Sequence, residues 1–223
     1  MDWQPLLLTF KLALVTTILL LIVSIPLAYW LAYSKSKIKP IIETFVSMPL
    51  VLPPTVIGFY LLLVFSPSSM IGHWLHTTLG IQLIFSFKGL VIASILYSLP
   101  FMVHPIQAGL ANLSSTLIEA SYVLGKSKTR TLFKILLPNI KPSLLTGIVL
   151  AFAHTIGEFG VVLMIGGNMP GKTKVASIAI YDEVEALNYD TAHMYSLILF
   201  IITFFILLLV YLINGSYLKR FWR

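Results

Sequence analysis

Residues 12–33 read LALVTTILLLIVSIPLAYWLAY and contain no charged side chain. The hydrocarbon core of a bilayer is about 30 Å thick and is crossed by roughly 20 apolar residues of α-helix, so this stretch predicts a transmembrane span. Four further stretches are long and apolar enough for the same role, although prolines weaken the second and third of the five. The sequence therefore predicts an all-α, polytopic helix bundle whose spans cover residues 12–33, 41–65, 89–110, 144–165 and 194–213.

The composition of the 223 residues suits a bilayer better than water, since 58% are hydrophobic and only 10% are charged. Soluble domains have about a quarter of their residues charged, so a soluble enzyme is excluded. The net charge of +7 comes from basic residues that flank the apolar runs, which indicates membrane topology rather than a nucleic-acid partner. The absence of Cys removes thiolate chemistry and Cys-based metal sites. We find no internal repeat, and expect residues 1–223 to form one membrane domain.

Lys and Arg are distributed unequally between the two sides of the predicted bundle. Of the fifteen, eleven lie on one side: Lys35, Lys37, Lys39, Lys126, Lys128, Arg130, Lys134, Lys141, Lys219, Arg220 and Arg223. By the positive-inside rule this side is cytoplasmic, which places the N-terminus outside and the C-terminus inside.

The longest cytoplasmic connection, residues 111–143, contains helix signals that a flexible tether would lack. Thr116 and Glu119 have the spacing of a capping box at a helix start, and Gly125 suits a helix end that needs positive φ. Ser127 can cap a second helix, which Pro138 limits. The connection is therefore predicted to fold into a helix, a tight turn and a helix, which together form a compact knob for docking.

One run in this connection, Glu119-Ala120-Ser121-Tyr122-Val123-Leu124-Gly125, resembles the EAA loop of ABC importer permeases. Ser121 stands where that family usually has Ala. The resemblance implies a coupling helix that sits in a cleft of a separate ATP-hydrolysing subunit. It assigns this role to a set of residues that extends into the second helix: Glu119, Ala120, Ser121, Leu124, Gly125, Phe133 and Pro138.

The resemblance extends over nearly the whole chain and is narrower than the superfamily. Several motifs are similar to those of molybdate permeases: SIPLAY at 24–29, MPLVLPPTVIG at 48–58, GEFG at 157–160, GNMPGKT at 167–173 and AIYD at 179–182. This resemblance implies a non-catalytic permease without a cofactor, located in a bacterial plasma membrane. It also implies a homodimer with two cytoplasmic ATPases and an extracytoplasmic oxyanion-binding protein. Molybdate is the preferred cargo, with sulfate, thiosulfate or tungstate as alternatives.

Two other classes of function remain as alternatives. A secondary transporter would usually show paired repeats and ion-coordinating residues within the membrane. An intramembrane enzyme would need a nucleophile with its base, or a metal site, and His154 with Glu158 falls short of either.

The outer loop 166–173 reads GGNMPGKT and matches the Walker A pattern of nucleotide-binding proteins. That pattern works between a strand of a parallel sheet and a helix, with a carboxylate ligand for Mg²⁺ elsewhere. Little more than one span follows it here, and the predicted topology places it outside the cell. We therefore interpret it as a turn fixed by Gly and Pro, which serves either as a simple reversal or as part of the pore mouth.

Glu158 is the one acidic residue deep inside a predicted span, and an intramembrane charge indicates a functional site. His154 lies four residues earlier on the same helix face and is placed to hydrogen-bond with it. A fixed carboxylate would repel a passing oxyanion, so direct binding of the anion is not expected. The role of Glu158 is either packing or an interhelical hydrogen bond, or else lining or gating the pathway. The residues considered for the pathway or its gate are scattered along the chain: Pro53, Pro54, Thr55, Glu158 and Asn168.

Overall fold

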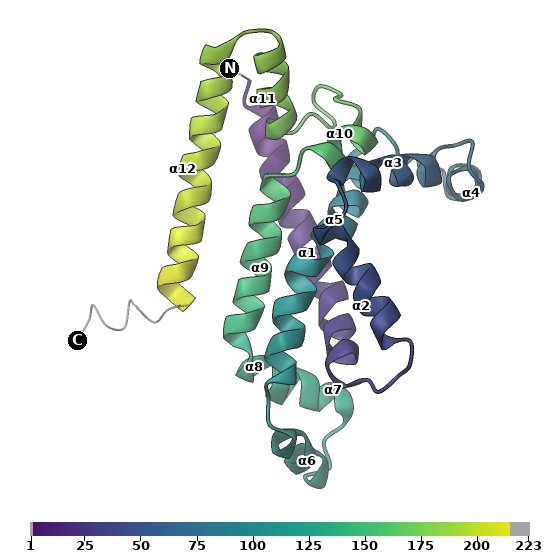
Figure 1. The fold of residues 1–223 in the computed structure, drawn as a ribbon, viewed down its shortest axis with the longest axis vertical. Coiled ribbons are helices and arrows are strands. Elements are labelled where there is room, and N and C mark those ends of the chain that lie inside the picture. The colour runs from purple at the N-terminus through teal and green to yellow at the C-terminus, as the bar shows by residue number, and fades with distance from the viewer. Residues whose placement is uncertain (1, 215–223) are drawn as a thin grey trace.

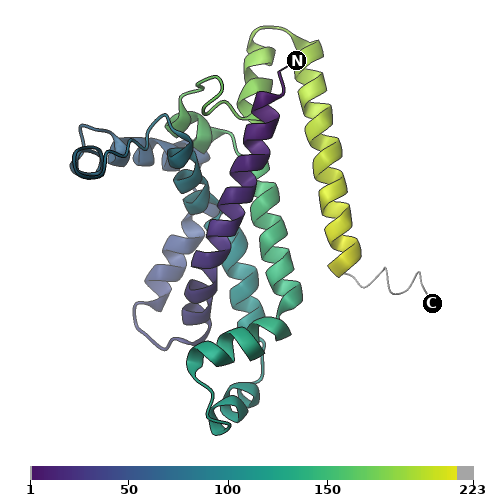
Figure 2. The same ribbon diagram turned by 180° about the vertical axis from the view of Figure 1, so that it is seen from behind.

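The computed structural model describes residues 2–214, and all regular structure within them is helical (Figures 1 and 2). Three helices are each long and apolar enough to cross a membrane, and two bent helix pairs raise the number of candidate spans to five. The predicted all-α bundle is therefore confirmed. The basic residues Lys219, Arg220 and Arg223 lie outside the described residues.

The first and third predicted spans are continuous helices. Helix α1 runs from Gln4 to Tyr33, and begins eight residues before the predicted start at residue 12 because Pro5 is accommodated in its first turn. Helix α5 covers Phe87–Ala111 and begins where the Ser86 hydroxyl accepts a hydrogen bond from the amide of Gly89 at 3.2 Å. These two helices pack against each other along the centre of the molecule (Figures 1 and 2).

The second predicted span is not a continuous helix. It divides into α2 (Lys39–Ser47), the 3₁₀ turn η1 (Met48–Leu50) and α3 (Pro54–Phe65), with a bend of 113° at the break. Pro53 and Pro54 cause the break, because proline lacks an N–H group and its ring disfavours a helical residue before it. In Figure 1, α3 points sideways out of the bundle and leads to α4 (Met70–Leu79).

The fourth predicted span is also broken, which the sequence did not predict. Helix α9 covers Lys141–Ile156, and the short helix α10 covers Gly160–Gly166. The residues between them, Gly157, Glu158 and Phe159, are not helical. Glu158 therefore lies in a break between two helices rather than on the face of a continuous one.

The predicted cytoplasmic connection forms α6 (Ser115–Val123), α7 (Lys128–Thr131), the π-helical turn η2 (Leu132–Leu136) and α8 (Leu137–Asn139). The predicted capping box at Thr116 is wrong, because Ser114 is the N-cap and its hydroxyl accepts from the Thr116 amide. The predicted cap at Ser127 is confirmed. Pro138 sits in the last turn of the second helix, which ends at Asn139 before an 82° bend into α9.

The last part of the chain forms α11 (Ala176–Glu185) and α12 (Tyr189–Asn214). Helix α11 was not predicted, and α12 begins five residues before the predicted start of the fifth span at residue 194. Figure 1 shows the α11–α12 corner at the end of the molecule opposite α6, and α12 standing beside the bundle.

Candidate functional site

Two helix breaks from distant parts of the sequence meet in one place. The start of α3 packs against the start of α10 so closely that a Cβ added to Gly160 would lie 3.2 Å from Pro54 Cβ and Thr55 Cγ2. A cavity of about 390 Å³ opens where the two breaks meet. It is lined by residues of α3, α5, α9, the second break and the start of α10: Pro54, Thr55, Tyr97, Ala153, His154, Gly157, Glu158, Phe159 and Gly160. Three of the predicted pathway residues, Pro54, Thr55 and Glu158, are thus brought together, and Pro53 immediately precedes them.

Glu158 is held by hydrogen bonds from two elements of the fold, α5 and α11. Its side chain is almost completely buried, and Ser94 and Ser98 of α5 each donate to one of its carboxylate oxygens. The bond from Ser98 Oγ to Glu158 Oε1 measures 2.8 Å. The hydroxyl of Ser177 in α11 donates to the backbone carbonyl of Glu158. A buried carboxylate needs such donors, and here they join the break to both α5 and α11.

His154 reaches Glu158 through Ser98 and not directly. The distance from His154 Nδ1 to Glu158 Oε1 is 3.6 Å, which is too long for a hydrogen bond, whereas His154 Nδ1 lies 2.8 Å from Ser98 Oγ. The direct hydrogen bond predicted from the sequence is therefore wrong. The imidazole is stacked on Phe101 with 4.0 Å between ring centroids and lies 4.8 Å from the ring of Tyr97.

The cavity at the helix breaks offers hydrogen-bonding side chains to a polar solute. The Glu158 carboxylate is occupied by serine hydroxyls, while Thr55, Tyr97 and His154 contribute polar side chains to the cavity wall. Within residues 2–214 no group of three or more His, Asp and Glu side chains is placed to hold a metal ion. Sequence reasoning missed Ser94 and Ser98, although their spacing of four residues puts both on one face of a helix.

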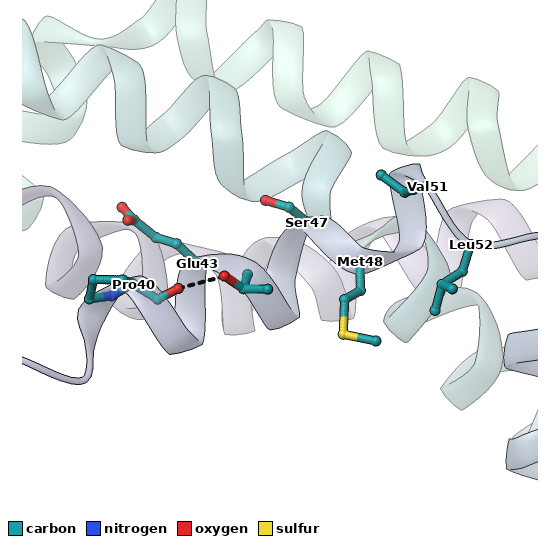
Figure 3. A pocket seen from close by; sticks show the side chains of 7 residues that line it. Pro40, Glu43, Ser47, Met48, Val51 and Leu52 are labelled. Atoms are coloured by element: carbon teal, nitrogen blue, oxygen red, sulfur yellow. Dashed lines mark hydrogen bonds between the residues drawn. The ribbon is translucent and has the colours of Figure 1, made fainter.

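A second cavity, of about 600 Å³, opens along α2 and η1 on the side of the bundle that leads toward α6. Figure 3 shows Glu43 and Ser47 on one side of α2, with Met48 and Leu52 on the other. Both polar side chains contact α5: Gln107 Nε2 donates to Glu43 Oε1 at 2.7 Å, and Ser47 Oγ lies 3.1 Å from His104 Nε2. The sequence analysis did not single out these residues, because polar residues near the end of a span usually only mark its boundary.

Asn168 lies away from both cavities. It adopts a left-handed conformation with φ 54°, and its amide donates to both carboxylate oxygens of Asp182 at 3.0 and 2.9 Å. Lys174 Nζ forms an ion pair with the same carboxylate at 2.6 Å. The loop is thereby folded onto α11, and Asn168 is a loop-closing residue in this structure and does not line the cavity at the helix breaks.

The Walker A interpretation is excluded by the same region. Residues 161–165, which could be mistaken for a strand, belong to α10. The Thr173 hydroxyl is buried, donates to the Gly166 carbonyl at 2.7 Å and accepts from the Met169 amide at 2.9 Å, so it is not available to bind Mg²⁺.

Residues 115–139, which form α6, α7, η2 and α8, present apolar side chains at the end of the molecule. We refer to them as the α6–α7 knob. Gly125 has φ 70°, which confirms the predicted left-handed turn after α6. Most of the residues predicted to contact the ATPase are exposed: Glu119, Ala120, Leu124, Gly125, Phe133 and Pro138. Ser121 is the exception. It is 1% exposed, and its hydroxyl lies 2.8 Å from Thr131 Oγ1, which joins α6 to α7.

The sequence is similar to membrane components of known transport systems. The family model described as "Binding-protein-dependent transport system inner membrane component" matches residues 24–223. The chain is 44% identical over 211 residues to the molybdenum transport system permease protein ModB of Azotobacter vinelandii, which covers 94% of this chain and 93% of the relative. It is 31% identical over 208 residues to a probable sulfate transport system permease protein of Nephroselmis olivacea, with 93% and 73% covered.

A solved structure shares the fold. The crystal structure of a bacterial ABC transporter involved in the import of the acidic polysaccharide alginate matches with a TM-score of 0.75 at 18% sequence identity, and the match covers 97% of this chain and 80% of the other.

Proposed function

The chain belongs to the family of binding-protein-dependent transport system inner membrane components, and on this premise we propose that it carries an oxyanion, molybdate in the first place, into the cytoplasm. As a member of this family it is the non-catalytic, multi-pass inner-membrane subunit of an ABC importer. Such permeases assemble with an ATPase and a binding protein. Membership of the family excludes the secondary transporter and the intramembrane enzyme.

The observation that supports molybdate is the 44% identity to a molybdenum permease over 94% of the chain. Sulfate is the second candidate, because the similarity to a sulfate permease is lower but also covers 93% of the chain. Tungstate and thiosulfate remain further alternatives from the sequence analysis.

The proposed mechanism couples the two ends of the bundle. ATP binding closes a pair of ATPases, and α6 of this chain transmits the movement to the bundle, which shifts toward an outward-facing state. Two ATPases need two such helices and this chain supplies one, so we propose a homodimer. In this arrangement the N-terminus is outside the cell and the C-terminus is cytoplasmic, as the distribution of Lys and Arg predicts.

The polar residues at the helix breaks form part of the proposed pathway. Thr55, Tyr97 and His154 line the cavity at these breaks. Glu158 acts as a structural link that keeps the break attached to α5 and does not bind the anion itself, because its oxygens are occupied by Ser94 and Ser98. Asn168 closes its loop against Asp182 and does not line this cavity.

Reconstitution tests the proposed function. The permease is placed in liposomes with its ATPase, and binding proteins loaded with molybdate, tungstate or sulfate are compared for their stimulation of ATP hydrolysis and anion uptake. We expect the molybdate-loaded protein to stimulate both. Stimulation by the sulfate-loaded protein alone would transfer the assignment to sulfate.

A further inference from the structure

The turn between α11 and α12 contains a bulky residue in a conformation that favours glycine. Leu187 has φ 58°. Its amide donates to the Val184 carbonyl at 3.0 Å, and the amide of Asn188 donates to the Glu183 carbonyl at 2.8 Å. These two bonds define a Schellman helix end, in which the left-handed position is usually glycine because a Cβ is disfavoured there.

The chain uses glycine at the corresponding position of other helices. Gly80 follows α4 with φ 63°, Gly125 follows α6 with φ 70°, and Gly167 follows α10 with φ 64°. Leu187 therefore differs from the residues at these three helix ends, whereas Phe85 and Asn168, which also have positive φ, lie in turns between helices. Strained residues of this kind cluster at functional sites, where the surrounding structure holds them in place.

The Leu187 side chain contributes little to packing within the protomer. It is 72% exposed, and Tyr189 and Val184 beside it are 61% and 40% exposed. All residues from 184 to 190 are exposed, and they form the tip of the molecule opposite α6 (Figure 1). We refer to residues 184–190 as the outer corner.

The outer corner lies beyond the hydrocarbon core. Helix α12 has 26 residues, and at about 1.5 Å per residue it is longer than the roughly 30 Å of the core, so its polar first turn with Asp190 extends into water. Glu183 and Glu185 lie on the other side of Leu187. Lys174 forms its ion pair with Asp182 rather than with either of these glutamates.

We propose that the outer corner is a docking knob for the soluble oxyanion-binding protein, with Leu187 as its apolar anchor and Glu185 and Asp190 as its acidic rim. The proposal rests on the proposed function, which supplies this partner and the outward orientation. An apolar tip bordered by carboxylates complements a protein surface that has an apolar socket bordered by Lys or Arg. Anionic lipid headgroups would instead repel these carboxylates.

Replacing Leu187 by glycine separates a docking role from a structural one. Glycine relieves the backbone strain, so the purified permease should unfold at the same or a higher temperature. The apparent affinity of the assembled complex for a molybdate-loaded binding protein should nevertheless fall by about tenfold, which is typical of a lost apolar anchor. This is measured as the binding-protein concentration that gives half-maximal ATPase stimulation, with the basal ATPase rate unchanged.

Two further variants are measured in the same assay, the first as a control and the second as a test of the acidic rim. Phe200→Ala removes an apolar side chain that is 70% exposed farther along α12, and it should leave docking unchanged. The double variant Glu185→Gln with Asp190→Asn should weaken docking at low salt and reduce its dependence on salt concentration.

Several outcomes overturn the inference. They are unchanged docking by Leu187→Gly, a loss of docking that parallels a loss of thermal stability, or dissociation of the permease dimer, which would make the corner an interface between copies of this chain. If the unsubstituted complex does not respond to any loaded oxyanion-binding protein, the proposed function itself fails, and the inference fails with it.

Discussion

The α6–α7 knob and the site at the helix breaks are both formed where helices end, but different contacts hold them together. In the knob, Ser121 contacts Thr131, ten positions later in the chain. At the breaks, Ser94 and Ser98 contact Glu158, which is 64 and 60 positions away. The knob is therefore a local unit, whereas the site at the breaks exists only after α5 has packed against α9. Substitutions in the knob should affect coupling alone, and substitutions at the breaks should affect the bundle as well.

Glu158→Ala should have the largest effect. It removes the acceptor for the hydroxyls of Ser94 and Ser98, and leaving buried polar groups without partners costs about 1–3 kcal/mol each. We expect a lower unfolding temperature together with nearly complete loss of anion uptake. Glu158→Gln should be milder, because the amide keeps the shape and one acceptor oxygen. If both variants lose transport equally while remaining stable, the negative charge itself is required and the structural role of Glu158 is wrong.

Gly125→Val should abolish coupling without disturbing the bundle. A Cβ at Gly125 would meet nothing within 4 Å, so the cost arises from the left-handed backbone alone, on the order of 1–2 kcal/mol and larger for valine than for alanine. We expect normal membrane insertion, with ATP hydrolysis that no longer drives uptake.

Gly157→Ala is the matched control at the helix breaks. Gly157 has φ −87°, and the nearest atom to an added Cβ is 3.7 Å away, so this variant should behave like the wild type. Normal uptake by Gly125→Val would remove the argument that α6 is the coupling helix.

Cross-linking distinguishes the surface of the knob from its interior. The chain has no Cys, so an introduced Cys is unique. Leu124→Cys, at a position 72% exposed, should form a disulfide with a Cys placed in the ATPase cleft, whereas Ser121→Cys should not. Ser121→Ala should cost only about 0.5–1.5 kcal/mol, the usual value of one hydrogen bond. A cross-link from residue 121 that is as efficient as that from residue 124 would show that α6 separates from α7 in the complex.

Lys172→Ala should have the smallest effect. Its loop lies at the end of the molecule opposite the knob, and the Thr173 hydroxyl beside it is used within the loop (Figure 1). ATP hydrolysis by the assembled complex should match that of the wild type, although docking of the binding protein can be mildly weaker. This expectation would be contradicted if the isolated permease bound nucleotide and Lys172→Ala abolished that binding.

The sequence alone was sufficient for features that depend on neighbouring residues. Hydrophobic length predicted the membrane helices, and α5 matches its predicted span within two residues at each end. Local hydrogen bonding predicted the cap at Ser127 and the left-handed Gly125. These features follow from backbone geometry and burial within a single segment.

Only the tertiary structure revealed how the two breaks meet. The break after α9 has no proline to mark it, and it is stabilised by donors from Ser98 in α5 and Ser177 in α11. The burial of Ser121 likewise depends on where α7 lies. The energy of a buried polar group depends on partners that are distant in sequence, and the pattern of a single segment contains no information about them.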